Sequence, residues 1–171
     1  MTIPALRALT MALLAILPTG GAAAQPAPEP PPISAYSYAR QAQSVDALVR
    51  AASNALLATA PDAELTRLAR MLETDHGRSA ARFGRWTGGA AEPQLLGADA
   101  RRLRKLERVV RERQDDELLE ELIEIHEDAL ALHEAYARSG AHPDLRRAAA
   151  LAAPAVAGHL AELRRLEAAQ N

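Results

Sequence analysis

Beyond residue 35, apolar residues recur every three or four positions, and this spacing constrains the fold more than any other feature. The clearest stripe consists of Leu65, Leu68, Leu72, His76, Ser79 and Phe83. Alanine and leucine supply most of the 49% apolar content while aromatic residues make up 3%, and this mixture favours helix over strand. The 171-residue chain is therefore predicted to be all-α, with one antiparallel four-helix bundle.

Charge and capping signals predict where the helices begin and end. Basic residues dominate 101–113 and acidic residues dominate 115–124. Because cations stabilise a helix C-terminus and acids an N-terminus, one short helix should end near Glu112 and a new one should start at Asp115. The expected main helices run over 36–58, from Pro61 to a point before Gly88, over 115–138 and over 143–166. The short helix thus precedes the third main helix.

The first 24 residues have the parts of a secretory signal peptide. Arg7 supplies the positive charge, an apolar stretch covers 8–17, and Ala22 to Ala24 provide the small residues before a cleavage point. The apolar stretch is about half the roughly 20 residues needed to span a bilayer. We therefore expect export to the periplasm, with cleavage after Ala24 and no transmembrane segment in the mature protein.

A proline-rich tether is expected over 25–35, followed by the bundle domain over 36–168. The chain has no cysteine, which excludes thiolate metal sites and thiol chemistry. Its formal charge of −2, or −3 once the leader with Arg7 is removed, argues against a nucleic-acid partner. An envelope protein is the partner class left open, and the oligomeric state is not predicted. No nucleophile motif or phosphate-binding loop is present, so we expect no catalytic residues and no enzyme.

Three helices each carry one histidine on the side expected to be buried: His76, His126 and His159. A buried imidazole must satisfy two nitrogens, and the sequence leaves two interpretations open. The first is a site for iron, zinc or copper, assisted by Glu73 or Asp75. The second is a set of hydrogen-bonded core histidines with no cofactor.

A complete di-iron site is not encoded. Glu73 and His76 have the three-residue spacing of such sites, but Ile123 and Val156 stand three residues before the other two histidines. His133 and His142 are expected at the surface or in loops.

The chain resembles a widespread family of exported bacterial proteins with a ferritin-like helical bundle, domain of unknown function 4142. The resemblance rests on the order and spacing of three stretches, RLARMLETDH at 67–76, HEDALALHEAYARSG at 126–140 and PDLRRAAALAAPAVAGHL at 143–160. It implies the ferritin-like fold but no reaction. Such proteins often have a glutamate in the first helix where Val49 stands, an aromatic-Asp start where Gln114-Asp115 stands, and a tyrosine where Leu118 stands.

Two functions are therefore predicted as alternatives. One is a periplasmic metal-binding protein with an envelope or stress role. The other is a non-catalytic structural or interaction module of the cell envelope, whose histidines serve packing and a response to pH.

Overall fold

The computed structural model describes residues 33–59, 62–89 and 95–170, and these form five helices and no strand. They are α1 (Ala35–Ala58), α2 (Ala63–Gly84), α3 (Gly97–Glu112), α4 (Asp115–Ser139) and α5 (Pro143–Gln170). The predicted signal peptide and the tether up to residue 32 lie outside the described residues. Within the described part, no helix has the length and apolar character needed to cross a bilayer.

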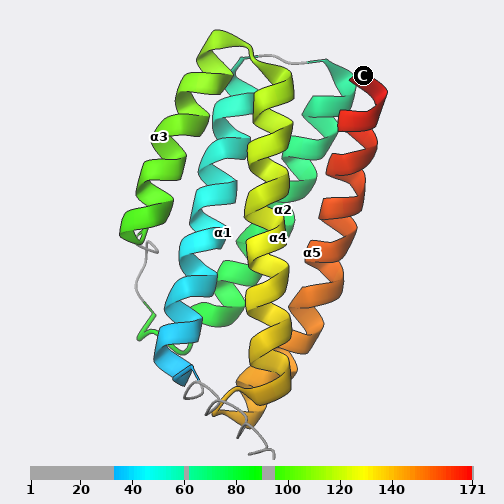
Figure 1. The fold of residues 1–171 in the computed structure, drawn as a ribbon. Coiled ribbons are helices and arrows are strands. Elements are labelled where there is room, and N and C mark those ends of the chain that lie inside the picture. Colours follow the sequence, from blue (N-terminus) through cyan, green and yellow to red (C-terminus); the bar gives the residue numbers. More distant parts are fainter. Residues whose placement is uncertain (1–32, 60–61, 90–94, 171) are drawn as a thin grey trace, which may run out of the picture. The chain divides into compact units, whose positions relative to one another are not determined.

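Four of these helices form the predicted antiparallel bundle. The most extensive packing joins α1 to α2 and α4 to α5, and α1 also packs on α4 and α2 on α5. In Figure 1, α1 and α5 run upwards while α2 and α4 run downwards, so every adjacent pair among these four helices is antiparallel. Helix α3, which follows α2 and precedes α4 in the sequence, carries the chain back along the bundle. A single long crossover of this kind is the connection found in ferritin-like bundles.

The helix boundaries follow local chemistry. The Asp62 side chain accepts hydrogen bonds from the Glu64 and Leu65 backbone N–H groups at 2.8 and 2.9 Å, which caps α2. The predicted break between a basic and an acidic helix is confirmed, since α3 ends at Glu112 and α4 begins at Asp115. Arg113 makes the turn in a left-handed conformation, with φ of 55°.

Helix α3 is held to α4 by ion pairs as well as by Leu106. The buried Glu121 of α4 pairs with Lys105, and Arg102 reaches Asp128 at 2.8 Å. A buried carboxylate needs such partners, because an unpaired charge in the interior is costly. The crossover helix therefore covers the outer side of α1 and α4.

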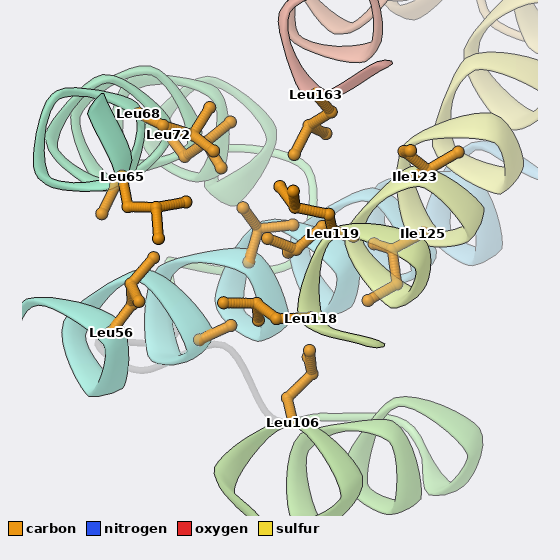
Figure 2. Packing of buried hydrophobic residues seen from close by; sticks show 14 of the residues in the cluster. Leu56, Leu65, Leu68, Leu72, Leu106, Leu118, Leu119, Ile123, Ile125 and Leu163 are labelled. Carbon is orange, nitrogen blue, oxygen red and sulfur yellow. The ribbon is translucent and has the colours of Figure 1, made fainter. Parts of the chain in front are cut away.

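The bundle has two apolar clusters rather than one continuous core. The larger lies towards the α1–α2 and α3–α4 connections and is rich in leucine (Figure 2); it includes Leu56, Leu68, Leu106, Leu119 and Leu163. The smaller lies towards the opposite end and includes Tyr38, Phe83, Tyr136 and Leu145. Along every main helix the two clusters are separated by a segment that carries buried polar side chains.

Candidate metal centre

The polar segment between the two clusters brings the three predicted histidines together. His76 comes from α2, His126 from α4 and His159 from α5, and each side chain continues the apolar stripe of its helix. They are 3%, 0% and 5% exposed. One nitrogen from each ring lies within 4.8 Å of the others. Three separate helices therefore direct imidazoles into one buried space.

His126 has a defined tautomer because its outer nitrogen contacts a backbone carbonyl. Its Nδ1 lies 2.7 Å from the Leu122 oxygen, and a carbonyl can only accept, so Nδ1 carries the proton. The Nε2 atom of the neutral ring is then an acceptor. It faces Nε2 of His76 at 3.3 Å. If Nε2 of His76 is an acceptor too, a proton or a cation is needed between the two nitrogens.

His76 is held by a carboxylate of the first helix. Its Nδ1 lies 2.8 Å from Oδ1 of Asp46, which is itself 2% exposed. When Asp46 is ionised, Nδ1 donates to it and Nε2 of His76 becomes a second inward-facing acceptor. When Asp46 is protonated, its hydroxyl donates to Nδ1 and Nε2–H of His76 donates to His126 instead.

His159 is the third ring with one nitrogen engaged and one available. Its Nε2 lies 3.1 Å from Oδ2 of Asp75, a carboxylate that can only accept when ionised. Its Nδ1 is buried without a hydrogen-bond partner. All three imidazoles thus contact an oxygen atom with one nitrogen, and contacts of this kind orient histidines around metals.

Burial keeps His76 and His126 neutral at ordinary pH. It lowers the pKa of His76 to about 3, with a further lowering from His159. It lowers the pKa of His126 to about 3 as well, aided by His76. Burial also raises the pKa of Asp46 well above its usual range, against the opposing effects of Ser79, Arg50 and Arg82. A neutral imidazole is the form that binds a metal ion.

The two predicted assisting carboxylates take different places. Asp75 contacts His159 directly and also pairs with Arg78 at 3.3 Å. Glu73 lies on α2 as expected but pairs with Arg50 of α1, with 3.7 Å between Nη2 and Oε1. Of the two, Asp75 is the carboxylate that the fold brings to the histidines.

Asp46 is the site residue that sequence reasoning missed. It lies three residues before Val49, where the resemblance pointed to an absent carboxylate, and it occupies the same face of α1 as Ala42 and Val49. The signal was an acid on an apolar stripe at helical spacing. The first helix does supply a carboxylate to the site, one turn earlier than expected.

The prediction for His133 was wrong, and that for His142 is confirmed. His133 is 4% exposed and packs among Tyr38 and Phe83. It follows His126 by seven residues, two helical turns, and so shares its buried face. His142 lies in the connection before α5, with its ring centroid 4.4 Å from that of Trp86.

The chain belongs to the family described as a domain of unknown function (DUF4142), which matches residues 18–166. The match covers all of the bundle except the last residues of α5. Among curated proteins and solved structures, none matches the chain. Family membership therefore confirms the resemblance and assigns no activity.

Proposed function

We propose that this protein is an exported, periplasmic metal-binding protein whose site is formed by His76, His126 and His159. The observation that carries the proposal is the orientation of the rings. Each ring contacts an oxygen atom with one nitrogen, and one nitrogen from each ring lies within 4.8 Å of the others in a shared buried space. In a purely structural cluster, the buried Nδ1 of His159 would have no partner.

The spacing of the two nearest nitrogens favours a tetrahedral ion. Metal–nitrogen bonds of about 2.0–2.1 Å in a tetrahedron place neighbouring ligand atoms about 3.3–3.4 Å apart. The Nε2 atoms of His76 and His126 are 3.3 Å apart. One nitrogen of His159 lies within 4.8 Å of ligand nitrogens of both other rings. Three imidazoles without thiolate suit zinc first, with iron and copper as the other borderline candidates.

The N-terminal segment supports the location. Its charge, apolar stretch and small residues are those of a cleavable signal, and the family resemblance is to exported proteins. In the envelope, a buried histidine site of this type suits binding or sequestration of metal ions during stress. N-terminal sequencing of the protein from a periplasmic fraction is expected to begin at Gln25, whereas a chain retained in the cytoplasm with residues 1–24 contradicts the assignment.

Metal content is the direct test. Untagged protein purified from the periplasm, or refilled with Zn²⁺, is expected to hold about one equivalent of metal. The His76→Ala, His126→Ala double variant should hold none, while His142→Ala should match the wild type, with circular dichroism to verify that each variant is helical. Wild-type protein that takes up no Zn²⁺, Fe²⁺ or Cu²⁺ overturns the proposal.

The second candidate is a non-catalytic structural module, and one observation favours it. With Asp46 protonated, an unbroken chain of donors runs from Asp46 through His76 and His126 to the Leu122 carbonyl. The raised pKa of Asp46 is consistent with that state. In this case, the double variant melts earlier although the wild type is metal-free.

A further inference from the structure

A cleft between α2 and α5 leads from the surface to the histidines. Its inner part is a cavity of about 230 Å³ lined by residues that include His76, His159, Arg82 and Ala155. Its outer part, about 520 Å³, is lined by Arg82, Arg85 and Arg147 among others. Because Arg82 and Leu151 line both cavities, the two adjoin and together outline a path towards the histidines.

The lining of this path is positively charged. It contains the four arginines 78, 82, 85 and 147 and the two acids Asp75 and Asp144. Asp75 pairs with Arg78, and Asp144 pairs with Arg147. Within the described part of the chain, Arg82 and Arg85 form no ion pair with a carboxylate. Arg82 acts electrostatically on Asp46 without an ion pair, so an anion in the cleft is attracted by two arginines that are not paired with a carboxylate.

The inner end of the path meets an unsatisfied group. The buried Nδ1 of His159 has no partner, and His159 lines the inner cavity. A three-histidine ion keeps a fourth position for a water molecule or a substrate. A cavity of 230 Å³ is smaller than sites for drug-sized ligands, which begin at about 300 Å³, and it suits a molecule of a few heavy atoms.

We infer that the metal site takes a small monovalent anion as its fourth ligand, and that this anion enters through the α2–α5 cleft past Arg82. The inference rests on the proposed metal-binding function. The step is a ligand exchange: a lone pair of the anion forms the new bond to the metal as the bound water leaves, with no change of oxidation state. Arg82 is a positioning residue, since it attracts the anion without binding the metal.

Cobalt-loaded protein and azide provide the test. The visible bands of Co²⁺ report its coordination, so azide titrated into full-length Co²⁺ protein should change the spectrum with saturation. Arg82→Gln should weaken azide binding about fivefold, because one nearby positive charge is removed, and the difference should shrink at high salt. Arg67→Gln, on the same helix but outside the cleft, should not weaken it.

A steric variant tests the path itself. Ala155→Leu extends an exposed residue into the inner cavity and should abolish the azide response while Co²⁺ binding remains. Ala161→Leu makes the same change at an exposed position of α5 outside the cleft and should respond like the wild type.

The outcomes separate the two proposals. Protein that binds no Co²⁺ overturns both. Protein that binds Co²⁺ but shows no azide response overturns only the anion site. The anion site is also overturned if Arg82→Gln and Ala155→Leu respond to azide in the same way as the controls Arg67→Gln and Ala161→Leu.

Discussion

The bundle buries histidines in two regions that differ in what their ring nitrogens contact. In the region between the two apolar clusters, hereafter the histidine layer, three rings contact oxygen atoms, and one nitrogen from each ring lies within 4.8 Å of the others. In the smaller apolar cluster, His133 instead contacts a tyrosine hydroxyl. The Tyr38 hydroxyl lies 2.8 Å from its Nδ1, and burial raises the pKa of Tyr38, so the phenol keeps its proton.

The surroundings of His133 are those of a satisfied core residue. Its ring stacks on Phe83 at 5.7 Å with an interplanar angle of 14°, and Tyr38 in turn stacks on Tyr136 at 3.8 Å. Aromatic contacts of this kind stabilise a core beyond the area they bury. Burial alone therefore does not identify a ligand. The convergence of ring nitrogens from three helices does.

The largest expected difference between the two regions is in metal affinity. His126→Gln removes a proposed ligand and should lower Zn²⁺ affinity more than about 100-fold, since loss of an outer partner alone costs about 10- to 100-fold. His133→Gln, two turns further along the same helix, should leave affinity within about twofold. Competition with a chromophoric chelator measures both. Equal losses in the two variants would contradict the distinction between the regions.

The sequence was sufficient to predict the helices and the inward orientation of the three histidines in the histidine layer. The change from basic to acidic residues around 113–115 located a helix boundary because helix dipoles act locally on nearby charges. Helical phase predicted that His76, His126 and His159 face inward, since the apolar stripe of each helix must be buried. Both inferences needed only one helix at a time.

The partners of the histidines could not be predicted in this way. Whether Asp46 meets His76 depends on how α1 is rotated and shifted against α2, which packing of both helices determines. The same limit applies to Glu73, whose spacing to His76 was suggestive but whose side chain turns to Arg50. His133 is different, because its seven-residue distance from His126 already indicated burial.

A smaller effect is expected when the outer partner of a histidine is removed in each region. Asp46→Asn keeps the size of the side chain but takes away the carboxylate that orients His76, so Zn²⁺ affinity should fall about 10- to 100-fold. Tyr38→Phe removes the hydroxyl that contacts His133 and should cost about 1 kcal/mol of unfolding free energy. Chelator competition and urea denaturation measure the two quantities.

The two variants distinguish the histidine layer from the smaller apolar cluster, because each should affect one of the two measurements more than the other. Tyr38→Phe is expected to leave Zn²⁺ affinity unchanged, since its hydroxyl contacts no proposed ligand. If Zn²⁺ affinity drops as much in this variant as in Asp46→Asn, the two regions act as one metal site and the distinction between them is wrong.

The smallest effect is the dependence of stability on pH that His133 contributes. Burial lowers its pKa to about 4, below the value of about 6.5 for an unfolded chain. As pH falls below about 6.5, the His133 ring takes up a proton in the unfolded state but not in the folded state. The stability that the neutral ring contributes is therefore fully present above about pH 6.5. It decreases as pH falls from there towards the folded pKa of about 4. Between about pH 7 and about pH 5.5 the loss from this one group is about 1 kcal/mol.

Urea denaturation at these two pH values, with chelator present, isolates this contribution. His133→Gln should reduce the loss of stability by about 1 kcal/mol, whereas Tyr38→Phe, which keeps the titrating ring, should retain most of it. Adding Zn²⁺ should steepen the pH dependence of stability in both variants, because protons compete with the metal for the imidazoles of the histidine layer. The difference in pH dependence between His133→Gln and Tyr38→Phe should stay the same. A difference that changes with Zn²⁺ would mean that His133 responds to the metal, and the two regions would then act as one.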